Sequence, residues 1–189
     1  MKIVLAAIGG AAAIMVWGMV FWNTPLPYHM LERLPDEESA IEAIRANFPA
    51  PGTYMIPSSS TPRETRTALE DSGMVATVDV SYSAGNSLDA FHCAIRSFPA
   101  ALIATLIMSW VVSRFCASMT GPYIKRVSFV PLLACATTLL SRLFQPLWWS
   151  QPLGWLAVQV AYELSAWLAA GAVIVAVICP APSRLPDGP

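Results

Sequence analysis

The sequence predicts a mainly α-helical membrane protein, with four transmembrane helices and a small α+β extracytoplasmic domain inserted between the first and the second. Its composition is the first observation behind this prediction. Of the 189 residues, 56% are hydrophobic and 12% are charged, about half the charged fraction of an average soluble domain. Mean hydropathy is +0.55. The second observation is four apolar runs of the roughly 20 residues that a helix needs to cross a bilayer.

These runs divide the chain into four spans and one extended polar region. The predicted spans are residues 1–22, 98–117, 127–147 and 155–179. The first is longer than the apolar segment of an ordinary signal peptide, and no small-residue cleavage motif follows it, so we expect an uncleaved anchor. Residues 23–97 lie between the first two spans and are the part of the chain that could fold in water.

Basic residues in short segments predict the orientation. Lys2 precedes the first span, Arg114, Lys125 and Arg126 flank the turn between the second and third, and Arg184 follows the fourth. Short loops rich in Lys and Arg stay in the cytoplasm. We therefore expect both termini to be cytoplasmic, with residues 181–189 as a cytoplasmic tail, and the polar region to lie on the other side of the membrane.

The first half of the polar region predicts a helix followed by a short strand. In "LPDEESAIEAIRANFP", Asp36 is the expected N-cap, acidic residues follow in the first turn, and Ile41, Ile44 and Phe48 recur at helical spacing. The segment "PGTYMIP", bounded by prolines, is the expected strand.

The second half predicts another helix and another strand. "STPRETRTALEDSG" has Thr61 as the expected N-cap, Pro62 at the first helical position, Glu64 at the capping-box position and Gly73 at the end. "MVATVDVSY" alternates apolar and polar residues, which predicts a strand with one buried face. After the turn "AGNS", we expect a helix that begins near Ser87 and continues into the second span.

Two charged residues within the apolar hairpin of the third and fourth spans are the first candidate site. Arg142 and Glu163 are about equally far from the loop centre at 151–152, nine residues before it and eleven after it, so an antiparallel hairpin places them at similar depth, toward the outer interface. An ion pair there would offset desolvation, and Arg142 could instead extend to water. Ionisable residues in a span are often functional, so partner or lipid binding and an ion relay are the alternatives.

A second candidate group precedes the second span. Asp89, His92 and Arg96 are spaced by three and four residues, which places them on one face of a helix. They could form a pH-sensitive latch or hold an anionic lipid headgroup. The simpler interpretation is a polar stripe that faces solvent or the outer domain.

The cysteines and tryptophans have ordinary structural interpretations. Cys93, Cys116, Cys135 and Cys179 are isolated in apolar surroundings, without the spacing of a metal or thiol redox motif, and we expect small packing residues with reduced thiols. Several tryptophans lie at the outer ends of the spans, where aromatic belts anchor helices, and a role in substrate stacking is the less favoured alternative. These are Trp22, Trp148, Trp149 and Trp155.

Small residues in the first span predict a close helix contact. Ala6 with Gly10, and Gly9 with Ala13, form pairs four residues apart, and such pairs let two helix backbones approach closely. We expect this contact within the monomer in preference to a dimer.

The order of motifs is similar to that of a known group. "VWGMVFWNTPLPYHM", "LPDEESAIEAI" and "PGTYMIP", followed by three spans with an aromatic "PLWW" turn and Glu163 in the last helix, resemble an uncharacterised family of small four-span bacterial inner-membrane proteins. The resemblance implies a bacterial inner membrane, with residues 23–97 in the periplasm. It implies no catalytic or binding residues.

The sequence lacks the motifs of several function classes. A net charge of -1 offers no basic surface for nucleic acid, and no pattern indicates a cofactor, a metal or a catalytic group. We expect a non-enzymatic accessory or scaffolding protein that contacts membrane lipids and other membrane subunits, as a peripheral subunit of a larger complex such as a respiratory or photosynthetic one. The alternative is a small transporter or lipid-handling protein that uses Arg142 and Glu163.

Overall fold

Four long helices dominate the fold of this computed structural model, which describes residues 1–73, 75–81, 90–118, 121–149 and 152–180. The long helices are α1 (Lys2–Trp22), α4 (Ala90–Phe115), α5 (Tyr123–Trp149) and α6 (Leu153–Ile178). Each contains a segment long and apolar enough to cross a membrane. The predicted class, a mainly α-helical protein with four such helices and a small α/β region after the first, is confirmed.

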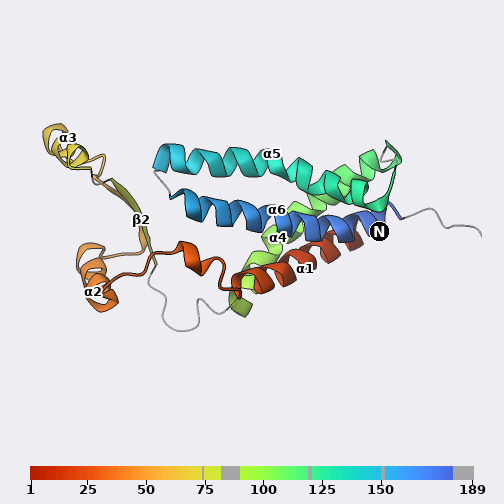
Figure 1. Cartoon of the computed structure of the whole chain (residues 1–189), viewed down its shortest axis with the longest axis horizontal. Helices are drawn as coiled ribbons and strands as arrows, with labels where there is room; N and C mark the ends of the chain where they lie inside the picture. The colour runs from red at the N-terminus through yellow and green to blue at the C-terminus, as the bar shows by residue number, and fades with distance from the viewer. Residues whose placement is uncertain (74, 82–89, 119–120, 150–151, 181–189) are drawn as a thin grey trace, which may run out of the picture.

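The long helices lie side by side in an elongated bundle, and the small α/β region projects from one end (Figure 1). The N-terminus lies at the opposite end of the bundle. Because successive long helices run in opposite directions, the start of α5 and the end of α6 also lie at this opposite end. We refer to the two ends as the polar-region end and the basic end, after Lys2, Lys125 and Arg126.

Small residues on α1 allow it to pack closely against α6. A Cβ atom on Gly9 would lie 2.8 Å from the Val173 side chain, and one on Gly10 would lie 3.1 Å from that of Ile174. Ala6 and Ala11 on the same helix are fully buried. The predicted close contact of the first span is therefore confirmed, and it is a contact within the chain.

The bundle has a continuous apolar core. On α6, Gly171 faces α5 so closely that a Cβ atom would lie 2.9 Å from Val130 Cβ. On α4, the buried Thr105 hydroxyl donates a hydrogen bond of 2.8 Å to the Ala7 carbonyl of α1. The buried apolar cluster draws on all four long helices and comprises Ala6, Met108, Val112, Val127, Val130, Ala134, Ala170, Ile174, Val175 and Cys179.

The polar region begins with a 3-10 helix, η1 (Tyr28–Met30), and then α2 (Glu37–Asn47). Asp36 caps α2 as predicted, because its carboxylate accepts a 3.1 Å hydrogen bond from the Ser39 backbone N–H. Strands β1 (Gly52–Ile56) and β2 (Ala76–Val80) then pair antiparallel, with Tyr54 opposite Val78. Both predicted strands are confirmed, but the inward face of β2 is only half-buried.

Helix α3 (Arg63–Asp71) separates the two strands, and its predicted N-cap is wrong. Pro62, not Thr61, is the N-cap, and no side chain caps the helix. Pro62 has an extended backbone (φ -51°, ψ 140°), so the helix begins one residue later than the capping-box pattern indicates. Gly73 follows the helix with φ +82°, a left-handed conformation that favours glycine.

The second span is one continuous helix from its first described residue. Helix α4 runs from Ala90 to Phe115 with Pro99 inside it, and a short 3-10 helix, η2 (Cys116–Ser118), follows. The predicted helix start near Ser87 lies outside the described residues.

Candidate functional site

The structure brings the two charged residues of the hairpin together. Arg142 of α5 donates from Nε to Glu163 Oε1 of α6 at 2.7 Å, and its Nη2 donates to the same oxygen. Its Nη1 donates to the Gln159 side chain at 3.4 Å. Both side chains of the pair are partly exposed, 32% for Arg142 and 22% for Glu163. The arrangement joins α5 to α6.

The pair lies in the part of the bundle nearest the polar region. Tyr162, beside Glu163, packs against Gly18 of α1, where a Cβ atom would lie 2.9 Å from the tyrosine hydroxyl. Gly18 is four residues, or about 6 Å of helix, from the end of α1 at Trp22. A charge at this depth is close to the interface expected at that end. This placement suits an ion pair that holds α5 and α6 together. That structural role stays a prediction.

Aromatic side chains gather around this level of the bundle. The Trp22 ring lies 5.9 Å from the Trp155 ring and 5.3 Å from the Tyr162 ring. Trp17 donates a 2.8 Å hydrogen bond from Nε1 to Ser165 Oγ, which ties α1 to α6. The side chains of Trp148 and Trp149 lie outside the described residues.

A cavity of about 600 Å³ adjoins these aromatic residues between α1 and the start of α4. Its described lining contains neither Arg142 nor Glu163, so the cavity and the ion pair are separate features. Most of the lining is apolar, with hydroxyl and amide groups among it: Ile14, Met15, Gly18, Met19, Trp22, Asn23, Tyr28, Cys93, Ser97 and Tyr162.

The predicted stripe before the second span falls largely outside the described part of the structure. Asp89 and the side chain of His92 are not among the described residues. Arg96 is described, on α4, and is exposed. The hypothesis of a latch or a lipid headgroup site at these three residues therefore stays a prediction.

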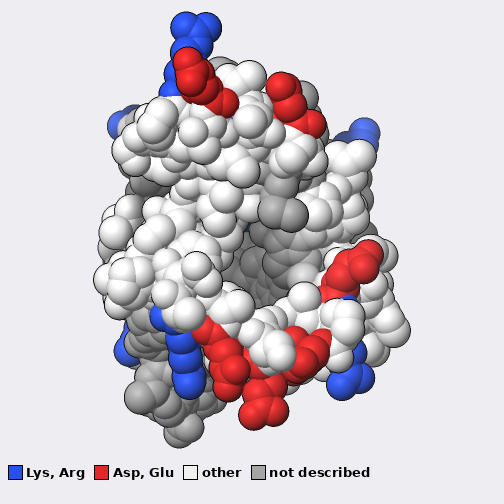
Figure 2. Space-filling model, turned by 90° about the vertical axis from the view of Figure 1, so that its left-hand side faces the viewer, with Lys and Arg blue, Asp and Glu red and all other residues white. Residues whose placement is uncertain are grey.

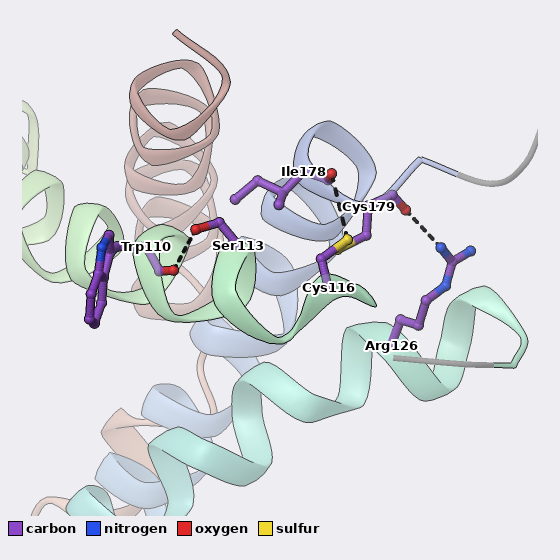
Figure 3. Close-up of a disulfide and its surroundings, with 6 residues drawn as sticks. All are labelled: Trp110, Ser113, Cys116, Arg126, Ile178 and Cys179. Atoms are coloured by element: carbon purple, nitrogen blue, oxygen red, sulfur yellow. Dashed lines mark hydrogen bonds between the residues drawn. A yellow bond between two sulfur atoms is a disulfide. The ribbon is translucent and has the colours of Figure 1, made fainter. Parts of the chain in front are cut away.

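At the basic end, the structure contradicts the prediction of isolated cysteines. Cys116, just after α4, and Cys179, at the end of α6, form a disulfide with their Cα atoms 5.8 Å apart (Figure 3). The two residues are 63 positions apart, so no local motif reveals them. A signal did exist, because the predicted topology places both at the same end of their spans.

Arg126 packs beside this disulfide (Figure 3). Its side chain extends from α5, is 9% exposed, and donates from Nη1 to the Cys179 carbonyl at 2.7 Å. This contact places a cation at the carbonyl end of α6, where the helix dipole favours positive charge. The Nε atom of Arg126 is buried and has no hydrogen-bond partner in the described structure.

The polar-region end has a different surface. Figure 2 shows this end, with acidic side chains prominent around its rim. Residues 23–97 contain ten acidic and five basic residues, a net charge of -5. On α2, Glu37, Glu38 and Glu42 are all exposed. The polar-region end is thus acidic, and the opposite end of the bundle is basic.

Comparisons with known proteins assign no family. No protein-family model, no curated protein and no solved structure matches the chain. Among the described residues, no group of three or more His, Cys, Asp or Glu side chains is placed to hold a metal ion. The four apolar helices therefore define the class, a multi-span membrane protein that contacts lipid.

Proposed function

We propose that this protein is a non-enzymatic accessory or scaffolding subunit of a bacterial inner membrane, which binds a larger membrane complex through its polar region. A respiratory or photosynthetic complex is the kind of assembly that suits such a subunit. The polar region is periplasmic in this proposal, and the basic end is cytoplasmic. The concentration of Lys2, Lys125 and Arg126 at that end supports the orientation.

The observation that carries the proposal is the exposure of apolar side chains in the polar region. Helices α2 and α3 have no buried residue. Ile41 and Ile44, on one side of α2, are 50% and 37% exposed, and Leu69 of α3 is 43% exposed. Among the described elements, none packs extensively against α2 or α3 to cover this face. A soluble surface rarely leaves several neighbouring apolar residues uncovered unless a partner covers them.

The acidic residues beside the apolar stripe of α2 indicate the chemistry of the partner. Glu37, Glu38 and Glu42 are exposed on the same helix as Ile41 and Ile44. An apolar centre with a charged rim is the usual composition of a protein interface. The complementary surface is an apolar patch bordered by Lys or Arg.

The contacts of the ion pair do not favour transport as the function. Arg142 and Glu163 are hydrogen-bonded to each other and to Gln159. They do not line the cavity described above. A transport path would need these charges to face a space that a substrate could enter.

The test is affinity purification of the tagged protein in mild detergent, with and without crosslinking. The wild type is expected to retain a reproducible set of membrane partners. The double variant Ile41→Glu/Ile44→Glu is expected to lose them, because it places charge in the apolar stripe. Ala43→Glu/Ala46→Glu is the matched control, since both alanines are exposed on the far side of the same helix and the variant gains the same two negative charges.

Two results would count against the proposal. One is a wild-type protein that purifies alone from crosslinked membranes. The other is a partner set that survives unchanged in the double variant while α2 remains folded.

A further inference from the structure

We propose that Cys116 and Cys179 form a reversible thiol–disulfide exchange site, with thiols of the glutathione class as the reactant. The contacts of the two cysteines do not depend on the proposed function. The supply of glutathione does rest on it, because it requires the basic end to be cytoplasmic. Cytoplasmic thiols keep most disulfides open. A disulfide at the basic end is therefore expected to exchange with them.

The structure around Cys116 and Cys179 can hold both the disulfide and the reduced thiols. The two Cα atoms are 5.8 Å apart, within the usual range for a disulfide. Cys116 Sγ also lies 3.7 Å from the Ile178 carbonyl oxygen, which would accept a hydrogen bond from the reduced thiol (Figure 3). Each cysteine directly follows the last residue of a long helix, so the bond can open without breaking a helix in the middle.

The two sulfur atoms differ in access. Cys116 lies in the short η2 helix and is half-buried, whereas Cys179 is 3% exposed and belongs to the apolar core. An incoming thiolate therefore reaches Cys116 Sγ first. The sulfur that leaves is that of Cys179.

Arg126 is placed to stabilise that leaving group. Its guanidinium contacts the backbone of Cys179, and its buried Nε N–H has no partner in the described structure. A thiolate on Cys179 would supply both a counter-charge and an acceptor. Exchange is faster when the departing sulfur is a better-stabilised thiolate.

The reaction balances without any further reactant. A glutathione thiolate bonds to Cys116 Sγ as the S–S bond to Cys179 breaks, and Cys179 leaves as a thiolate that then takes a proton. A second glutathione thiolate attacks the glutathione sulfur of the mixed disulfide and releases Cys116 as a thiolate, which also takes a proton. The products are two protein thiols and one glutathione disulfide, and the reverse sequence restores the bond.

The test uses purified full-length protein in detergent, with Cys93 and Cys135 replaced by serine so that only two of the four cysteines remain. The folded protein is incubated in buffers of different reduced-to-oxidised glutathione ratio, trapped with a maleimide and weighed by mass spectrometry. The expected result is a smooth shift from disulfide to dithiol as the ratio rises. A disulfide that opens only after unfolding, or thiols that never join in excess oxidised glutathione, would overturn the proposal.

The role of Arg126 has its own readout, the rate of reduction. Arg126→Gln is expected to slow opening of the disulfide at least about threefold, and Arg126→Lys, which keeps the charge, to restore most of the rate. Arg114→Gln is the matched control, because Arg114 lies near the same end and also faces an aromatic ring, that of Trp110, but is exposed. Equal rates in Arg126→Gln and Arg114→Gln would overturn the role given to Arg126.

Discussion

The helix bundle and the polar region are held together in different ways. In the bundle, small residues such as Gly10 and Gly171 bring helices into close contact around a buried apolar cluster. In the polar region, α2 and α3 bury no residue, and a two-stranded sheet is the only sheet in the described part of the chain. Local hydrogen bonds, such as the Asp36 cap, define its elements.

The difference shows what each part depends on. Lipid covers the apolar outer surface of a bundle, so close helix packing is sufficient to specify it. In water, burial of apolar surface stabilises a fold, yet the polar region leaves Ile41 and Leu69 half-exposed. A two-stranded sheet is marginal alone. The bundle is therefore expected to be stable by itself, and the polar region to gain stability from a partner.

The largest expected effect is from overpacking the bundle at Gly171. Gly171→Leu forces a side chain into Val130 and the Val127 carbonyl and is expected to lower the free energy of unfolding by about 3 kcal/mol. Gly154→Leu is the control, because a Cβ there would lie 3.4 Å from only the Met30 sulfur. Thermal unfolding in detergent measures both. Equal destabilisation would contradict close packing at Gly171.

The next largest expected effect is the loss of unfolding free energy when an ion pair is broken, and each region offers one such pair. Glu163→Gln removes the counter-charge of the partly buried Arg142 and is expected to cost about 2 kcal/mol. Glu70→Gln breaks the exposed pair with Arg66, whose Nε lies 3.7 Å from Glu70 Oε1, and is expected to cost under about 0.5 kcal/mol. Unfolding in mixed micelles measures the difference. If Glu163→Gln is as mild as Glu70→Gln, the structural role of the ion pair between α5 and α6 is refuted.

The smallest expected effect is the pH dependence of the Asp36 cap, which affects α2 alone. The Ser39 hydroxyl and backbone N–H, which donate to the carboxylate, hold the pKa of Asp36 below its ordinary value of 3.8. A lowered pKa means that the cap stabilises α2 fully above pH 3.8 and loses this effect as the pH falls toward the lowered value.

Hydrogen exchange of the α2 amides measures this loss. Exchange in wild type, corrected for the intrinsic pH dependence, is expected to rise below pH 3.8. Asp36→Ala should show high exchange at neutral pH and no such step, whereas Asp71→Ala, at the far end of α3, should leave α2 unchanged. A step of the same size in Asp36→Ala would show that another group is responsible.

Local features of the sequence predicted most of the fold. Apolar length alone located the four spans, because a helix that crosses lipid needs about 20 apolar residues. Similar distances from the hairpin loop predicted the meeting of Arg142 and Glu163. Alternation predicted β2, and the residue types around Asp36 predicted its cap. Each of these signals is local, or follows from one short antiparallel connection.

The remaining features depend on contacts that the sequence does not encode locally. Cys116 and Cys179 meet because α4 and α6 end at the same side of the bundle, 63 residues apart. The predicted N-cap of α3, Thr61, was wrong because Pro62 itself takes the extended backbone of an N-cap. The cavity beside Tyr162 requires the angle between α1 and α4, which no residue pattern specifies.

The central claim is that the polar region and the basic end lie on opposite sides of a membrane. Labelling with a membrane-impermeant maleimide tests it, in a background where serine replaces the four cysteines. Thr65→Cys of α3 and Ser118→Cys of η2 are exposed probes for the two ends. The account predicts that intact cells label Thr65→Cys, and that Ser118→Cys reacts only after permeabilisation. Labelling of both in intact cells, or the reverse pattern, would contradict it.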